Sequence, residues 1–383
     1  MLALLCSVSC AATPAPTPPP AKAGSAQPHA AVPPSNQRPA APVNQGCLKT
    51  MPKSWRQAID AGRVPAMSGD GRIRPTAVGP DGRALFGELA AGDPARIDGA
   101  TKKEIVRYDF VSRTWSPIYA MPDAATDQQV DGVFDGRRMV FALQHSLTSY
   151  DDWSVHVWDQ QTNEARVLDQ DAGFRGPLIY VDAAAGKAVW SKAVGKNIVE
   201  VHLYDLAASR DQVIARGQIG TAWIVGDLVI WPQIVGPGSQ AVFQAASLTS
   251  GNRVETPAGL SKTGPLTQIA ASGSTLVWIE GNFRAIRAWR IGWPEPRTVF
   301  DSGRDRAVDD VNVAGDIVSW HSLEPGQPVY LGDMRTGSCT QVTERNGYTV
   351  SNKDAMVVIY PESKSSFGAF VVRPSRLPPL PEK

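Results

Sequence analysis

A repeated strand signature constrains the fold of this chain more than any other feature. A turn containing glycine, Asp or Asn precedes a short apolar run that ends in an aromatic residue, and these aromatics are Phe86, Phe141, Trp190, Trp231, Trp278, Trp320 and Tyr360. They recur about every 40 to 55 residues, which is the spacing of propeller blades. A β-rich run precedes each copy and an alternating run follows it, which predicts a hairpin and a third strand.

Seven such units, each with a more polar fourth strand, predict an all-β fold, a β-propeller of about seven four-stranded blades over residues 46–375. One blade cannot bury both of its faces alone, but blades stacked around a ring can, with the repeated aromatics between them. The last unit lacks a fourth strand. We therefore expect an N-terminal strand near residues 62–67, after a short helix at 53–61, to complete it and close the ring. A six-bladed ring remains an alternative.

The segments outside the predicted domain indicate export. Residues 1–10 resemble the end of a secretory signal, and Cys10 follows small residues as in the bacterial lipoprotein box. We expect lipidation of Cys10, and the alternative is its removal with an ordinary signal peptide. Residues 11–45 are rich in proline and alanine and predict a disordered linker, and residues 376–383 predict a disordered tail. The chain is thus expected to be extracytoplasmic, either lipid-anchored in the cell membrane or secreted.

Two further cysteines, Cys47 and Cys339, are expected to form a disulfide, because an even pair in an exported chain favours one. The alternative is two free thiols. The crosslink would close a long loop and stabilise the fold by roughly 3–5 kcal/mol. The chain has no CxxC motif and no Cys/His cluster, so no metal site is predicted.

Charge and motifs exclude several classes of function. With 38 basic and 37 acidic residues the net charge is +1, which predicts no nucleic-acid binding. No apolar run is long enough for a transmembrane helix. A P-loop, an HExxH motif and a GxSxG nucleophile elbow are all missing, so neither a cofactor nor a catalytic mechanism is predicted. We expect a monomer.

The strand-ending aromatics and three Tyr-Asp or Trp-Asp pairs resemble the TolB-like exported propeller proteins of bacteria, over residues 74–374. The pairs are Tyr108-Asp109, Trp158-Asp159 and Tyr204-Asp205. The resemblance implies the fold but not a function, because this fold hosts many unrelated activities. The three aspartates are expected to accept backbone N–H groups in the turns that follow them.

Candidate ligand-binding residues lie in the loops between second and third strands and between blades, because long variable loops on a rigid scaffold commonly bind ligands. They are His145, Tyr150, Asp151, Asp152, Trp153, Arg175, His321 and Glu324. The between-blade loops add Asp123, Asp127, Asp171, Asp309 and Asp310. Paired carboxylates suit acid–base chemistry or a hard cation, and exposed aromatics suit a glycan or a peptide. The alternative for Asp151 and Asp152 is that they only cap turns.

His156 and His202 occupy equivalent positions in the third strands of neighbouring blades. Stacked sheets lie roughly 10 Å apart, so one metal ion could hardly reach both side chains. We expect both to be structural.

Three hypotheses of function follow. The first is a membrane-tethered binding or scaffold protein of the cell envelope whose ligand is a protein, a peptide or a glycan. The second is a secreted polysaccharide lyase or glycoside hydrolase that uses His145 with Asp151 and Asp152. The third is a purely structural subunit of an envelope complex. The lack of a recognisable catalytic motif favours the binding module.

Overall fold

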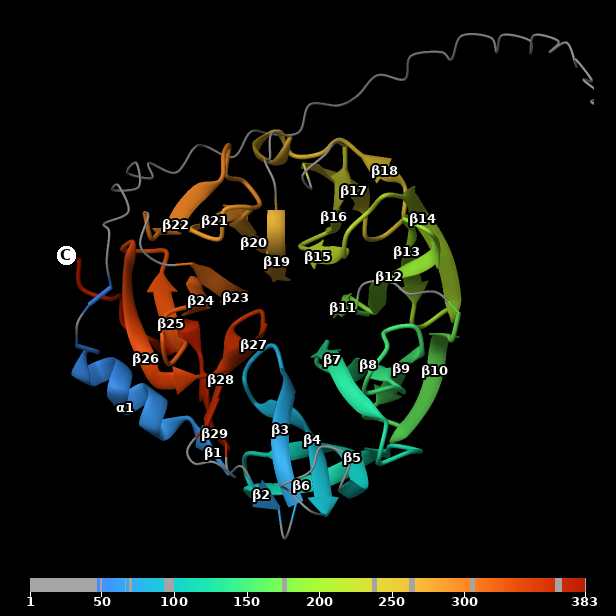
Figure 1. The fold of residues 1–383 in the computed structure, drawn as a ribbon, viewed down its shortest axis with the longest axis horizontal. Coiled ribbons are helices and arrows are strands. Elements are labelled where there is room, and N and C mark those ends of the chain that lie inside the picture. The colour runs from blue at the N-terminus through green and yellow to red at the C-terminus, as the bar shows by residue number, and fades with distance from the viewer. Residues whose placement is uncertain are drawn as a thin grey trace, which may run out of the picture. The chain divides into compact units, whose positions relative to one another are not determined.

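Seven antiparallel sheets stand around a central axis as the blades of a propeller, each with its first long strand toward that axis (Figure 1). The computed structural model describes residues 47–48, 50–65, 67–68, 71–92, 100–173, 178–235, 240–261, 266–303, 307–361 and 367–382. Cys10 and the predicted linker lie outside the described residues. The predicted fold is confirmed, with seven blades rather than six.

Each blade is a run of consecutive strands. Blade 1 comprises β2 (Met67–Ser68), β3 (Gly71–Val78), β4 (Ala84–Gly92), β5 (Ala100–Asp109) and β6 (Thr114–Ala120); blade 2 comprises β7 (Gln128–Phe134), β8 (Arg138–Gln144), β9 (Trp153–Asp159) and β10 (Glu164–Asp171); blade 3 comprises β11 (Val181–Ala184), β12 (Lys187–Gly195), β13 (Ile198–Asp205) and β14 (Arg210–Gly217); blade 4 comprises β15 (Trp223–Val225), β16 (Leu228–Ile234), β17 (Ala241–Ser247) and β18 (Arg253–Val254). The two-residue β2 gives blade 1 a fifth strand that the repeat did not predict.

The remaining blades follow the same order. Blade 5 comprises β19 (Leu266–Ser272), β20 (Thr275–Glu280), β21 (Ala285–Arg290) and β22 (Arg297–Asp301); blade 6 comprises β23 (Val308–Ala314), β24 (Ile317–Ser322), β25 (Pro328–Asp333) and β26 (Ser338–Asn346); blade 7 comprises β27 (Tyr348–Asn352), β28 (Ala355–Pro361), β29 (Phe367–Val372) and β1 (Arg63–Val64). The helices are α1 (Lys53–Ala61) and the short 3₁₀ turns η1 (Ala258–Leu260) and η2 (Pro374–Arg376). Among the described residues, no helix has the length and apolar character needed to cross a bilayer.

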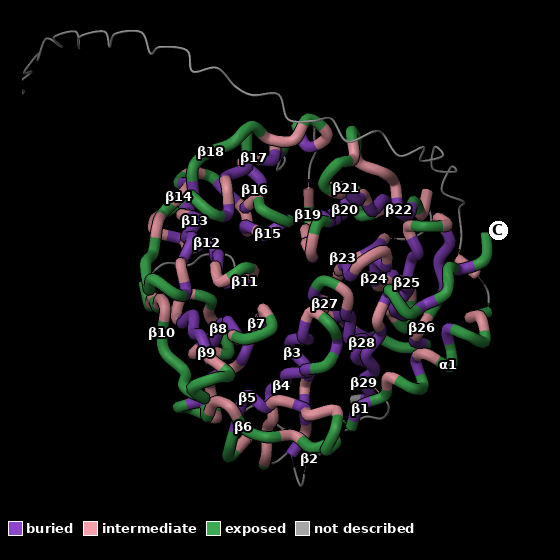
Figure 2. The backbone as a smooth tube through the Cα atoms, turned by 180° about the vertical axis from the view of Figure 1, so that it is seen from behind, coloured by how far each residue is buried: buried purple, intermediate pink, exposed green. Residues whose placement is uncertain are grey.

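Burial explains why the second strands carry the strongest signal in the sequence. In β8 and β20 every residue but one is buried, whereas residues of the outer strand β10 are exposed or half-buried. Figure 2 shows the same gradient from buried blade interiors to exposed outer strands and loops. A middle strand is covered on both sides by neighbouring blades, so its sequence is a continuous apolar run.

The repeated aromatics fill the space between blades. The ring of Phe86 lies 4.8 Å from Phe134 and 6.2 Å from Trp158, both in blade 2. Trp320 of blade 6 lies 4.8 Å from Phe300 of blade 5. These rings join blade 1 to blade 2 and blade 5 to blade 6, as the repeat predicted.

The ring closes through a strand from the N-terminal side of the chain. In β1, Arg63 pairs with Phe370 and Val64 pairs with Ala369 of β29, so β1 is the fourth strand of blade 7. This confirms the predicted closure. The preceding helix α1 buries Trp55 and Ile59, and it contacts β29.

A disulfide joins Cys47 to Cys339 in β26, with the two Cα atoms 4.5 Å apart. The predicted pairing is therefore confirmed. Beside it, Leu48 forms a parallel bridge with Thr340 at the outer edge of blade 6. The bond links positions 292 residues apart. In the unfolded state it closes a loop that contains most of the chain, and it therefore lowers the conformational entropy of that state.

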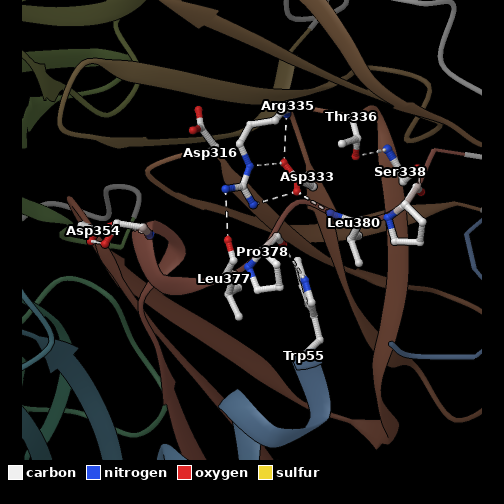
Figure 3. A network of polar contacts seen from close by, with 12 residues as sticks. Trp55, Asp316, Asp333, Arg335, Thr336, Ser338, Asp354, Leu377, Pro378 and Leu380 are labelled. Atoms are coloured by element: carbon white, nitrogen blue, oxygen red, sulfur yellow. Dashed lines mark hydrogen bonds and ion pairs between the residues drawn. The ribbon is translucent and has the colours of Figure 1, made fainter. Parts of the chain in front are cut away.

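Residues 374–382 form an ordered strap, in contrast to the disordered tail that was expected from residue 376 onward. Leu377 and Leu380 are 3% and 1% exposed, and they pack in one cluster with Trp55 of α1. The Trp55 indole donates to the carbonyl of Pro378 at 2.9 Å (Figure 3). The Ser338 hydroxyl donates to the carbonyl of Pro381 at 2.7 Å. The buried side chains of Leu377 and Leu380, together with these hydrogen bonds, hold the segment in place, although its proline content predicted a disordered tail.

Candidate functional site

The two ends of the blades are connected differently. At one end, the loop face, lie the connections between second and third strands and between consecutive blades, such as residues 145–152 and 121–127. At the other end, the hairpin-turn face, lie the first-to-second and third-to-fourth turns, such as 135–137 and 160–163. Each first strand therefore begins at the loop face and ends at the hairpin-turn face.

Three of the predicted ligand-binding residues share one loop-face segment in blade 2. Tyr150 is 58% exposed, and Asp151 accepts a hydrogen bond from the Ser149 hydroxyl. The backbone carbonyl of Asp152 accepts from the N–H of His145 at 3.0 Å. The segment thus presents one exposed aromatic ring beside half-buried carboxylates.

Trp153 differs from the expectation of an exposed aromatic. It is 5% exposed as the first residue of β9 and packs in the core cluster between blades 2 and 3. Lys192 of blade 3 lies 5.4 Å from its ring. Arg175 lies outside the described residues.

His145 is bonded at both ring nitrogens. Its Nδ1 lies 2.7 Å from Oδ1 of Asp127, and its Nε2 lies 2.8 Å from Oγ of Ser154, which in turn lies 2.7 Å from Nε2 of His156. The order Asp–His–Ser matches a serine-hydrolase triad, but Ser154 is 3% exposed within a strand and cannot reach a substrate. The chain of bonds instead ties the between-blade loop to blade 2.

This arrangement does not assemble the catalytic set of the enzyme hypothesis. The carboxylate that His145 contacts is Asp127, whereas Asp151 is bonded within its own loop. On the far side of the channel, in blade 6, His321 lies 3.5 Å from Asp309, and Glu324 accepts from Tyr330 at 2.8 Å (Figure 1). The predicted residues therefore form two separate groups on the loop face.

The equivalent histidines of the third strands are structural, as predicted. His156 stacks on Phe141 with ring centroids 5.1 Å apart, and His202 stacks on Trp190 at 5.4 Å. Each histidine is paired across the strands with the aromatic on which it stacks. Burial lowers the pKa of His156 to about 4, so its ring is neutral at physiological pH.

The aspartates that follow strand-ending aromatics cap turns, as predicted. Asp109 accepts from the N–H groups of Val111 and Ser112 at 2.7 and 2.9 Å. Hydrogen bonds from Arg137 and from Lys187 are the main causes that lower the pKa values of Asp159 and Asp205, respectively, to about 2. These carboxylates stabilise the hairpin-turn face.

The central channel holds a cavity of about 690 Å³. We call its loop-face part the channel site, because Tyr180, Ile219 and Leu266 on its wall lie at or just before the loop-face starts of first strands. Its polar wall comes from the first strands themselves and includes Asp131 of β7 and Asp182 of β11. A cavity of this size suits a small ligand or a short peptide segment.

Carboxylates in the channel bridge consecutive blades. Asp131 accepts from the N–H of Val181, and Asp182 accepts from the N–H of Ile224, both at 2.8 Å and both on the next blade. First strands of different blades belong to different sheets, so without these bonds their inner N–H groups would lack partners. Burial raises the pKa of Asp131 to about 7 and that of Asp182 to about 6.

A strained residue lines the same cavity from blade 6, on the other side of the channel. Asp310 of β23 has a φ of +52°, in the left-handed region that residues other than glycine rarely adopt, where the strand register shifts between Asp309 and Asn312. Burial raises its pKa to about 6. Such strain costs on the order of 1–3 kcal/mol and is concentrated at functional sites in proteins.

Sequence reasoning placed Asp310 in the loop-face set but missed Asp131 and Asp182. A signal was present in the runs Val130-Asp131-Gly132 and Val181-Asp182-Ala183, where one charged residue interrupts an apolar first strand in two consecutive units. Within the described part of the chain, no three His, Cys, Asp or Glu side chains gather in a way that could hold a metal ion.

No protein family model matches the sequence, and no curated protein does so. Solved structures match the fold at low identity. A prolyl endopeptidase is 14% identical with a TM-score of 0.58, over 86% of this chain and 50% of that chain. The β-propeller domain of the Trilobed protease from Pyrococcus furiosus is 10% identical with a TM-score of 0.55, over 80% of this chain and 94% of that one.

TolB from Acinetobacter baumannii is also similar, at 10% identity and a TM-score of 0.45, over 70% of this chain and 65% of that chain. This chain spans about half the length of the prolyl endopeptidase that it matches. At such identities the similarity to the prolyl endopeptidase and to the Trilobed protease domain shows a shared fold and nothing of activity.

Proposed function

We propose that this protein is a binding module rather than an enzyme, and that its ligand occupies the channel site on the loop face. The observation that carries this proposal is the cavity of about 690 Å³, which two desolvated carboxylates and a strained aspartate line from opposite sides. Perturbed, strained groups beside a cavity are typical of a functional site. Its ligand is a protein, a peptide or a glycan of the cell envelope.

Exposed apolar side chains around the cavity support binding on this face. Tyr180 and Ile234 line the cavity and are each 38% exposed. In other blades, Leu147, Phe283 and Leu323 are exposed in loop-face connections. A partner could bury this apolar surface.

We also propose that the protein is extracytoplasmic and tethered through Cys10. The Cys47–Cys339 disulfide supports an oxidising compartment, and the proline-rich residues 11–45 suit a spacer. Cys339 lies next to the turn at 334–337, on the hairpin-turn face. The described chain therefore begins, at residue 47, at the end of the ring opposite the channel site.

Binding can be tested with the purified full chain on peptide and glycan arrays, followed by mass spectrometry of the recovered ligand. We expect the recovered ligand to have the same mass as the ligand that was added. We expect its binding to be lost in the variant Ile234→Arg, because Ile234 lines the cavity. Ile291→Arg is the matched control, because Ile291 is similarly exposed, at 41% against 38%, but follows β21 on the hairpin-turn face. Turnover of a ligand that depends on His145, or equal binding by both variants, would contradict the proposal.

The tether is tested separately by membrane fractionation of cells that express the full chain. We expect the protein in the membrane fraction and its release into the soluble fraction in Cys10→Ser. A protein that is soluble with Cys10 intact would contradict the lipid anchor without affecting the binding proposal.

A further inference from the structure

Two carboxylate–aromatic pairs lie in succession on the channel wall. Asp131 accepts the backbone N–H of the residue after Tyr180, and Asp182 accepts that of the residue after Trp223, each at 2.8 Å. The rings of Tyr180 and Trp223 have centroids 6.2 Å apart. Burial, and next the charge of Asp131, raises the pKa of the Tyr180 hydroxyl, which places that carboxylate near the ring. The same arrangement therefore occurs between blades 2 and 3 and again between blades 3 and 4.

Neither carboxylate forms an ion pair with a described residue, and the charge of Lys353 is the weakest of the influences on the pKa of Asp182. Asp131 and Asp182 both accept hydrogen bonds from backbone N–H groups. Arg74 also lines the cavity, but its guanidinium lies 3.0 Å from Glu88 and donates to the carbonyl of Gln129 at 2.5 Å. A ligand that enters the cavity thus meets carboxylates that the nearby arginine does not neutralise.

Trp223 offers an unused donor. Its Nε1 is buried and has no hydrogen-bond partner among the described residues. A buried N–H without a partner is destabilising, and an acceptor atom on a ligand would remove that penalty. The neighbouring lining residues Ile219, Ile234 and Leu266 are apolar.

We infer that the channel site binds a protonated amino group that carries an adjacent carbonyl and an apolar or aromatic body. The ammonium group pairs with Asp131 and Asp182 and lies against the faces of the two aromatic rings. The carbonyl accepts from Trp223, and the apolar body fills the aliphatic side of the cavity. This chemistry belongs to the free amino end of a peptide and equally to an amino-acid amide. The inference rests on the proposed function, for which it names the ligand class.

Calorimetric titration of the full chain tests the inference with three probes: phenylalaninamide, the peptide amide Phe-Ala-Ala-NH₂ and its N-acetylated form. We expect the two free amines to bind and acetylation to weaken peptide binding about tenfold or more, because it removes a charge-assisted hydrogen bond. Tighter binding of the peptide than of phenylalaninamide identifies a peptide end as the ligand, and the reverse order identifies a free amino-acid derivative.

Two variants test the individual contacts. Asp182→Asn is expected to lower the affinity for both free amines about tenfold. Asp227→Asn, at an exposed turn carboxylate on the hairpin-turn face of blade 4, is the matched control and is expected to change nothing. Trp223→Phe keeps a ring but removes the donor. The variant is expected to bind phenylalaninamide several-fold more weakly. Its affinity for 2-phenylethylamine, which has no carbonyl, is expected to stay the same.

Equal binding of the acetylated and free peptides would overturn the inference, as would full affinity in Asp182→Asn. The proposed function would survive either result if other array ligands still bound in an Ile234-dependent way, and it would fail if no ligand did so. If Asp182→Asn does not fold, the acetylation comparison decides, because it uses the unaltered protein.

Discussion

The channel and the hairpin-turn face use the same residue type in opposite ways. On the hairpin-turn face, Asp159 and Asp205 each combine backbone donors with a cation, and their pKa values fall to about 2. In the channel, Asp131 and Asp182 have only backbone donors in a buried setting, and their pKa values rise to about 7 and 6. The surroundings of the first group favour the charged form, whereas those of the second group make ionisation costly.

The strap strengthens this contrast, because it adds stabilising contacts to the hairpin-turn face alone. The Asp333 carboxylate accepts from the Arg335 side chain at 2.8 Å and from the N–H of Leu380 at 2.9 Å (Figure 3). Farther along the strap, Ser375 donates to Asp354 in the neighbouring turn of blade 7. The comparison teaches that the turn aspartates and the strap add stabilising contacts to the hairpin-turn face, whereas the channel carboxylates do not gain stability from their charge.

The largest expected effect is at the closure of the ring. Cys339→Ser is expected to lower the free energy of unfolding by roughly 3–5 kcal/mol, because it frees a loop that spans most of the chain. Denaturant titration measures it. Binding of a channel ligand to the folded variant should not change, and a loss of binding in the folded protein would show that the two ends are coupled.

A smaller effect is expected in the strap. Leu380→Ala is expected to cost about 3 kcal/mol, because it leaves a cavity beside α1 and blade 6. The neighbouring Pro379 is exposed, so Pro379→Ala serves as the control and is expected to leave the free energy of unfolding nearly unchanged. Denaturant titration again reports both. Equal stability of the two variants would mean that the strap contributes nothing to the hairpin-turn face.

The channel carboxylates predict an unusual dependence on pH. Folding raises the pKa of Asp131 from 3.8 to about 7, so between these values the folded state binds more protons than the unfolded state. Stability should therefore fall as the pH rises from about 4 to 7, by roughly 3 kcal/mol from this residue. Asp131→Asn should flatten that slope in thermal unfolding. If the dependence of stability on pH were the same in Asp131→Asn, Asp131 would not be the group with the raised pKa.

The turn carboxylates predict a smaller effect of opposite sign. The lowered pKa of Asp159 contributes stability above its unfolded value of 3.8, which is lost as the pH falls to about 2. Because the pair with Arg137 lies at the surface, screening limits the contribution to about 1 kcal/mol. Asp159→Asn should remove that acid sensitivity in the same assay, and a steeper acid loss in the variant would contradict the assignment.

Features that depend on local pattern were predictable. Strand-ending aromatics, turn aspartates such as Asp109 and the pairing of Cys47 with Cys339 follow from spacing and residue type, and all three agree with the structure. The strap was missed, since proline content describes the average behaviour of a segment and not where Leu377 and Leu380 find a surface to cover.

The sequence alone determined the architecture of this protein, because each blade is built from local hairpins whose burial pattern recurs seven times. Only the tertiary structure decided which polar residues meet. Asp131 and Asp182 stand 51 positions apart and face one channel because closing the ring turns every first strand toward a common axis. His145 was paired with Asp127 rather than with Asp151 or Asp152 for the same kind of reason, since the partner comes from the loop that enters the blade.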